Sequence, residues 1–201
     1  MRFDVAGFSD RAGCSFNCDS LLWREKKESD GGVLAALCSA GDKRPESVRA
    51  VRLTALRILE LAGEADGAEA AERTVKTALK ETYAEMSGDA VLDAFTLTLA
   101  GDRAVWAGVG SAKLFLFSKG EIATVGSTVE LLSGSVGFAA GDALMLCSDG
   151  FYKALNSLEM QIDLFKSADA ARWLDYMLLR HVERLHMAGD SMSVLLCIAH
   201  E

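Results

Sequence analysis

The 201-residue sequence contains a single proline, Pro45, and no stretch rich in proline or serine that would mark a linker. A chain of this length suits one domain, so we expect a single domain over residues 1–201. The sequence also has no apolar run long enough to cross a bilayer, and its first ten residues lack the apolar core of a secretion signal. These absences predict a cytoplasmic protein with no membrane partner.

Positive charge is also scarce, since 21 Lys and Arg residues stand against 29 Asp and Glu residues and give a net charge of −8. A nucleic-acid-binding protein normally carries a basic stripe, and this sequence has none, so we expect no nucleic-acid partner. The acidic balance would suit a site for a divalent cation. The five cysteines, an odd number, fit a reducing compartment better than a disulfide framework.

The spacing of apolar residues alternates between the period of strands and that of helices along the chain. Strands are expected at residues 1–9, 19–23, 32–38, 143–147 and 192–199, with two hairpins at 94–110 and 113–125. Helices are expected at residues 45–59, 71–86 and 168–187, with a short one opened by Asn156 and Glu159 as a capping box. Runs of strands followed by runs of helices predict an α+β fold, with helices on a mainly antiparallel sheet or pair of sheets.

Three aspartates are placed where expected strands begin or end. Asp149 follows the apolar run 143–147, Asp190 precedes the last strand, and Asp19 opens an early one. Strand ends bring side chains from distant segments to one edge of a sheet, and Mg²⁺ and Mn²⁺ prefer oxygen ligands gathered in this way. Aspartate is also a common turn former. The pattern alone therefore leaves a metal site and simple turns as alternatives.

The order of four motifs favours the metal site. The stretch "GDALMLCSDGFYKAL" (141–155) resembles the Gly-Asp-…-Leu-Leu-Cys-Ser-Asp-Gly motif of the metal-dependent protein phosphatases of the 2C type. "AGDSMSVLLCIAH" resembles the closing Asp-Asn-(Ile/Val)-Thr motif of that family, "WAGVGSAKLFLFSKGEI" its Val-Gly-Asp-Ser-Arg-Ala-Tyr-Leu segment, and "DRAGCSFNCDSLLW" its opening Arg-x-x-Asn-Glu-Asp. The blocks occur in family order over nearly the whole chain, which also resembles the shorter relatives of the stage-II-sporulation-E type.

The resemblance implies an α–β–β–α sandwich, in which two mainly antiparallel sheets are flanked by helices. It also implies a dinuclear Mn²⁺ or Mg²⁺ centre at one edge of the sheets, where the ions activate a water that attacks a phosphoserine or phosphothreonine. Carried over residue by residue, it makes Asp19, Asp149 and Asp190 metal ligands.

The sequence departs from the family pattern at several of these positions. Cys38 stands where the family has the aspartate that bridges both ions, and Cys18 stands where it has the glutamate of the opening motif. The other departures are Cys14 near the position of the phosphate-binding Arg, Ser39 for a Gly, Ser191 for an Asn, and the lack of Asp and Arg in residues 110–113. A thiol cannot offset the repulsion between two dications held ~4 Å apart, so we expect one Mn²⁺ or Mg²⁺ ion rather than two.

The substituted positions leave several interpretations open. Asp42, four residues beyond Cys38, is a candidate substitute ligand if it turns inward. Cys18 and Cys38 form either a thiolate site for Zn²⁺ or a redox pair, or they are small buried residues, which is the interpretation we favour.

Three functions are compatible with the sequence. The first is a divergent serine/threonine phosphatase with weak or lost Mn²⁺- or Mg²⁺-dependent hydrolysis. The second is an inactive phosphatase-fold domain that binds a phosphoprotein or a regulatory protein. The third is an α+β interaction domain outside this family, whose Asp-Gly turns are only turns.

Overall fold

The computed structural model describes residues 1–25, 31–62, 67–86, 90–184 and 190–201. The strands are β1 (Arg2–Asp10), β2 (Asp19–Glu25), β3 (Val33–Ala40), β4 (Leu92–Ala100), β5 (Arg103–Ser118), β6 (Glu121–Gly137), β7 (Ala143–Cys147) and β8 (Met192–His200). The helices are α1 (Pro45–Leu61), α2 (Ala68–Glu85), α3 (Asp149–Tyr152), α4 (Ser157–Phe165) and α5 (Ala170–Glu183).

All the strand pairs are antiparallel, and they follow the order β1-β8-β7-β5-β4-β3-β2, with β6 on β5. The first part of β5 pairs with β4 and its last part pairs with β7, and register shifts fall between Gly108 and Lys113. The hydrogen-bonded path therefore folds over at β5 into two packed layers. At one edge of the path β1 and β8 run side by side, with Arg2 opposite His200.

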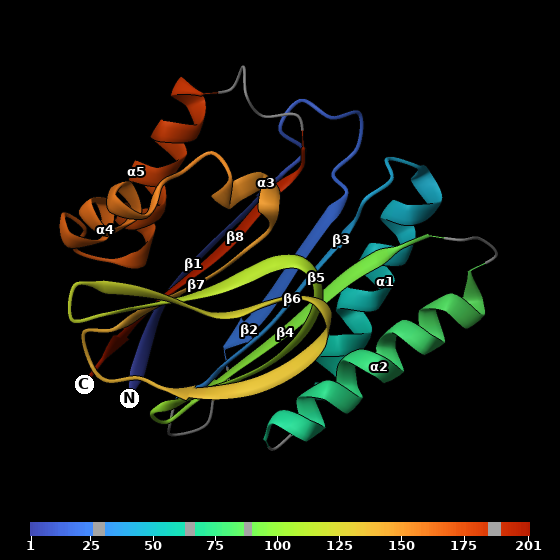
Figure 1. The fold of residues 1–201 in the computed structure, drawn as a ribbon, viewed down its shortest axis with the longest axis horizontal. Helices are drawn as coiled ribbons and strands as arrows, with labels where there is room; N and C mark the ends of the chain where they lie inside the picture. Colours follow the sequence, from blue (N-terminus) through green and yellow to red (C-terminus); the bar gives the residue numbers. More distant parts are fainter. Residues whose placement is uncertain (26–30, 63–66, 87–89, 185–189) are drawn as a thin grey trace.

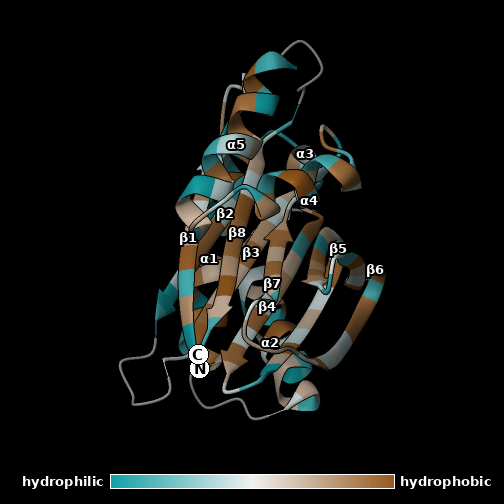
Figure 2. Cartoon of the chain, turned by 90° about the vertical axis from the view of Figure 1, so that its left-hand side faces the viewer, coloured by the Kyte–Doolittle hydropathy of each residue, from teal (hydrophilic) through white to brown (hydrophobic). Residues whose placement is uncertain are grey.

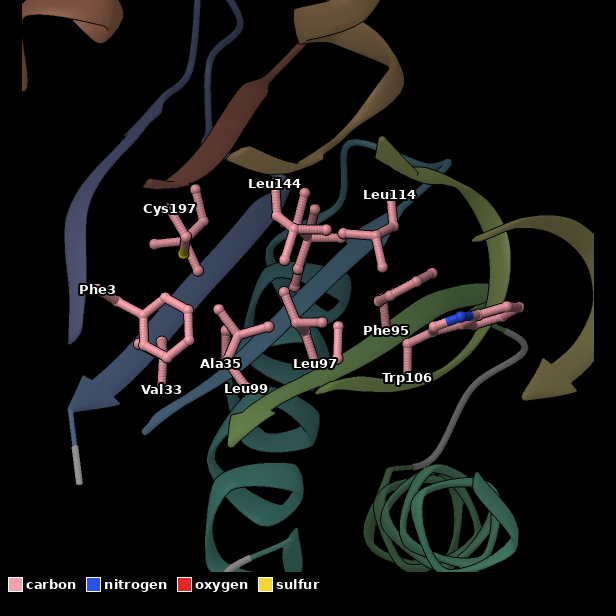
Figure 3. Close-up of a cluster of buried hydrophobic side chains, with 14 of the residues drawn as sticks. Phe3, Val33, Ala35, Phe95, Leu97, Leu99, Trp106, Leu114, Leu144 and Cys197 are labelled. Carbon is pink, nitrogen blue, oxygen red and sulfur yellow. The ribbon is translucent and has the colours of Figure 1, made fainter. Parts of the chain in front are cut away.

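The main core lies between the two layers (Figure 3). Period-two alternation along β3 sends Val33, Ala35 and Leu37 into this core, whereas Ala36 faces the helices. The facing layer contributes Leu144 from β7 and side chains from β8, and Phe95 stacks on Trp106 with ring centroids 5.8 Å apart. Burial of this apolar area supplies the main force that holds the layers together.

Helices cover both outer faces (Figure 1). α1 and α2 pack on β3 and β4, and α3, α4 and α5 pack on β1, β7 and β8. Trp173 of α5 is fully buried, and its indole Nε1 donates to the Met160 carbonyl at 3.2 Å. Figure 2 shows hydrophobic strands between more hydrophilic outer helices. The predicted α+β sandwich with two mainly antiparallel sheets flanked by helices is confirmed.

The predicted capping box of Asn156 and Glu159 is present at the start of α4. The two predicted hairpins are also present, since β4 turns into β5 at Gly101-Asp102 and β5 turns into β6 at Lys119-Gly120. The expected break between the two hairpins is absent, because β5 runs unbroken from Arg103 to Ser118 through Gly110 and belongs to both. Gly110 has φ of 107°, and a Cβ there would lie 2.0 Å from Asp93 Cγ. The backbone therefore bends at this glycine and does not turn back.

Two other expectations concern the helices. The expected end of the last helix, near residue 187, lies outside the described residues. Among the residues that are described, no helix is both long and apolar enough to cross a membrane.

Candidate metal centre

The structure places Asp19, Asp149 and Asp190 at the same end of the sandwich, and we call these three residues the aspartate rim. Asp19 is the first residue of β2, Asp149 is the first residue of α3, and Asp190 lies two residues before β8. Figure 1 shows α3 at the end of the molecule where β7 finishes and β8 starts. Their role as metal ligands stays a prediction.

Backbone contacts hold the three segments of the rim together. The Cys18 N–H donates to Ser191 Oγ at 2.9 Å, which ties the start of β2 to the segment before β8. A Cβ built on Gly150 would lie 2.1 Å from the Ser191 carbonyl oxygen, so α3 can approach this segment only with glycine at position 150. The glycine after Asp149 thus has a packing reason.

A group of hydrogen-bonded serine residues lies next to the aspartate rim. The Ser193 N–H donates to Ser148 Oγ at 2.9 Å, and the Ser148 N–H donates to the Ser193 carbonyl at 3.0 Å. The Ser9 and Ser193 hydroxyls are 2.7 Å apart, and Asn17 Nδ2 donates to Ser9 Oγ. These residues were not singled out from the sequence as site residues. The position of Ser193 within the otherwise apolar start of β8 was a weak indication that it has a polar partner.

Asp19 is the electrostatically unusual member of the rim. It is only 7% exposed, and among the described residues its Oδ2 atom has no hydrogen-bond partner. The pKa of Asp19 is raised to about 7, mainly by burial and to a smaller extent by the carboxylates of Asp190 and Asp149, although hydrogen bonds from Ser148 and Ser193 oppose the shift. A buried carboxylate oxygen without a partner is costly, and a cation at this point would remove the cost.

The other two carboxylates of the rim already have partners. Asp149 Oδ1 accepts from the Gly150 N–H at 3.0 Å, and Asp149 Oδ2 accepts from Lys153 Nζ at 2.6 Å. Asp190 Oδ1 accepts from the Ser191 N–H at 3.0 Å. As the side chains stand, no three His, Cys, Asp or Glu residues of the described chain are gathered closely enough to hold a metal ion. A cation would have to rearrange the rim as it bound.

Asp42, the candidate substitute ligand, is engaged elsewhere. Its Oδ2 accepts from the Arg44 guanidinium, with Nη2 at 2.6 Å. Hydrogen bonds from Arg44 are the main cause that lowers the pKa of Asp42 to about 2. Asp42 therefore stays ionised and paired at the start of α1, and ligation by Asp42 would require this ion pair to break.

All five cysteines lie in the described part of the chain, and each is buried and outside any disulfide. Cys38 is fully buried in the cluster between β3 and α1, and burial raises the pKa of its thiol. Burial also raises the pKa of Cys18, with Cys14 as its next largest influence. Both thiols are thus held neutral by their surroundings, as expected of small packed residues.

A fourth carboxylate near this end was missed from the sequence. Asp93 lies opposite Ser39 in the β3–β4 register, just as Asp19 lies opposite Ser39 in the β2–β3 register. Asp93 Oδ2 accepts from both the N–H and the hydroxyl of Ser111 at 2.8 Å. These bonds stabilise the bend of β5 at Ser111, within the segment that resembles the Asp-Ser-Arg part of the family motif. The role of Asp93 is therefore to bind the backbone of β5.

Comparison with known proteins supports the fold and leaves the chemistry open. No model of a protein family matches the sequence, and no curated protein matches it. Among solved structures, the serine/threonine phosphatase PstP/Ppp of Mycobacterium tuberculosis superimposes with a TM-score of 0.79 at 16% identity, covering 100% of both chains. Another structure of the PstP catalytic domain contains two manganese ions.

Two further solved structures extend this result. RsbX in complex with magnesium gives a TM-score of 0.73 at 13% identity over 97% of this chain and 94% of that one. PppA, described as a key regulatory component of T6SS in Pseudomonas aeruginosa, gives 0.78 at 16% identity over 99% and 98%. The chain therefore has the fold of the 2C-type protein phosphatases, as its motifs predicted.

Proposed function

We propose that this protein is a divergent 2C-type phosphatase domain in which phosphomonoester hydrolysis is weak or lost, and that it acts by binding a regulatory protein or a phosphoprotein. The observation that carries the proposal is the environment of Cys38. A neutral thiol, fully buried against α1, occupies the position that the resemblance gives to the bridging carboxylate. It supplies no negative charge between two dications.

One divalent ion fits the rim better than two. The orphaned Oδ2 atom of Asp19 supplies an open oxygen donor, and Asp149 and Asp190 are the other carboxylates that would hold Mn²⁺ or Mg²⁺. Such an ion would polarise a phosphoryl oxygen and lower the pKa of a bound water. This open donor favours residual single-ion hydrolysis as the second candidate function.

The proposed partner rests on the chemistry of the chain and on its structural neighbours. A net charge of −8 without a basic stripe argues against nucleic acid. PppA, one of the structural neighbours, is itself described as a regulatory component. A phosphatase fold that keeps its shape without its second metal can still present a surface to a phosphoprotein or a regulatory protein.

A hydrolysis assay tests the proposal directly. With millimolar Mn²⁺ and p-nitrophenyl phosphate or a phosphoserine peptide, we expect turnover about a hundredfold or more below that of the PstP catalytic domain assayed in parallel, because charge stabilisation by the second ion is missing. Turnover within about tenfold of PstP that disappears in Asp149→Asn would reject the proposal.

The substitution Cys38→Asp tests the assigned role of position 38. A carboxylate placed in this buried cluster lacks a counter-charge, so we expect the metal-free variant to lose about 3 kcal/mol of unfolding free energy in urea. Millimolar Mn²⁺ should recover part of that loss, and Cys38→Ser is the matched control that should not respond. If Mn²⁺ does not stabilise Cys38→Asp, then position 38 does not reach the metal site and its equivalence to the bridging aspartate is wrong.

A further inference from the structure

Two ammonium groups stand among the carboxylates of the rim. α3 begins at Asp149, so Lys153 lies one helical turn further on and its Nζ reaches Asp149 Oδ2 at 2.6 Å. From the loop before α1, Lys43 Nζ approaches Cys14 Sγ at 3.3 Å. Asp190 acts electrostatically on both lysines. The two ammonium groups therefore place positive charge beside the carboxylates of the rim.

Lys153 is the lysine that occupies a ligand position. Asp149 Oδ1 already accepts from the Gly150 N–H and Asp149 Oδ2 accepts from Lys153, so a metal ion at Asp149 would share its oxygens with these donors. Asp19 Oδ2, by contrast, is open. An ion that bound Asp149 would compete with Lys153 for the negative charge of Asp149 Oδ2 and would lie close to an ammonium group, which repels it.

We infer that Lys153 is a built-in counter-cation that competes with divalent metal ions for Asp149 and so weakens metal binding at the rim. The inference rests on the proposed assignment of Asp149 as a metal ligand. With Lys153 in this position, the negative charge of Asp149 is balanced even when no metal ion is bound. The lysine side chain is 67% exposed, so the pair can open and the rim keeps a residual affinity for Mn²⁺.

The test compares two lysines in similar ion pairs. Lys153→Met removes the competing ammonium, whereas Lys76→Met breaks the Lys76–Glu72 pair on α2, which also spans four residues at 2.6 Å and is similarly exposed. Mn²⁺ is titrated into the metal-free full chain by calorimetry, with the thermal midpoint as a second readout. We expect Lys153→Met to bind Mn²⁺ about fivefold more tightly, and Lys76→Met to match the parent protein.

Two further measurements sharpen the result. In Lys153→Met/Asp149→Asn the gain should vanish, and at high ionic strength it should shrink, because screening weakens the competition between exposed charges. Equal Mn²⁺ affinity in Lys153→Met and the parent would overturn the inference, as would no Mn²⁺ binding by either. Because the readout is binding, this outcome is separate from the hydrolysis assay, where high turnover would reject the proposed function instead.

Discussion

The molecule contains two clusters of carboxylates, each with one buried member, and their charges are balanced in different ways. On α4, Glu159 and Asp163 are paired with Arg180 of α5 and with Arg184, the residue that follows α5, and we call these four residues the arginine clamp. Arg180 donates to both oxygens of Asp163, at 2.6 Å from Nε and 2.8 Å from Nη2, and Arg184 donates to both oxygens of Glu159. At the aspartate rim no arginine serves the carboxylates in the described contacts, and Asp19 keeps an open oxygen.

The pKa values record this difference. Hydrogen bonds from Arg184 lower the pKa of Glu159 to about 2, whereas burial raises the pKa of Asp19 to about 7. In the clamp, each carboxylate is paired with an arginine, and these ion pairs join α4 to the C-terminal end of α5. The rim holds a carboxylate in an unfavourable state, which is common at functional sites and uncommon in purely structural ones.

The largest effect should come from breaking the clamp. Arg180→Met leaves Asp163, which is 3% exposed, without its bidentate partner, so we expect a loss of about 3 kcal/mol of unfolding free energy in urea at pH 7. Arg172→Met on the same helix is the control, since the Arg172–Asp175 pair is exposed and should contribute less than about 1 kcal/mol. Equal losses in the two variants would show that the clamp is no stronger than a surface pair.

Acid should weaken the clamp through Glu159. Its folded pKa lies below the unfolded value, so its stabilisation is fully present above about pH 4.5 and is lost as the pH falls through about 2. We expect the stability difference between the parent and Glu159→Gln to be about 2 kcal/mol at pH 6 and to shrink towards zero near pH 2. Urea unfolding at both pH values measures it. Glu69→Gln, at an exposed pair on α2, should show no such trend.

The smallest effect should be a gain of stability at the rim. Asp19→Asn removes a buried charge with an open oxygen, so we expect the metal-free protein to gain about 1 kcal/mol at pH 7.5 and to lose its stabilisation by Mn²⁺. Asp142→Asn is the control, because Asp142 is similarly buried but its Oδ2 accepts from the Ala139 N–H at 2.8 Å. A loss of stability in Asp19→Asn would mean that its carboxylate is paired as well as those of the clamp.

Features set by nearby residues were predictable from the sequence. The capping box of Asn156 and Glu159 needs only two residues three apart, and it marks the start of α4 correctly. The continuous apolar run at residues 33–38 likewise predicts a strand buried on both faces, as β3 is. The fold class followed from the order of such local signals together with the motif resemblance.

Features set by distant residues were not predictable. The continuity of β5 depends on Asp93, which reaches Ser111 from the neighbouring strand, whereas the sequence around Gly110 indicates a break between two strands. The open oxygen of Asp19 depends on burial by three other segments. The Lys153–Asp149 pair was within reach of sequence reasoning, but only if a helix is assumed to begin at Asp149.

The pairing of β1 with β8 fixes where a probe can be attached. Arg2 faces His200 at one end of this nine-residue pair, and Asp10 faces Met192 at the end beside the aspartate rim. Nine residues of strand span about 30 Å. Anchoring the protein to a sensor chip through either terminus should therefore leave the rim facing the bulk solution, where metal ions and partner proteins can be flowed over it.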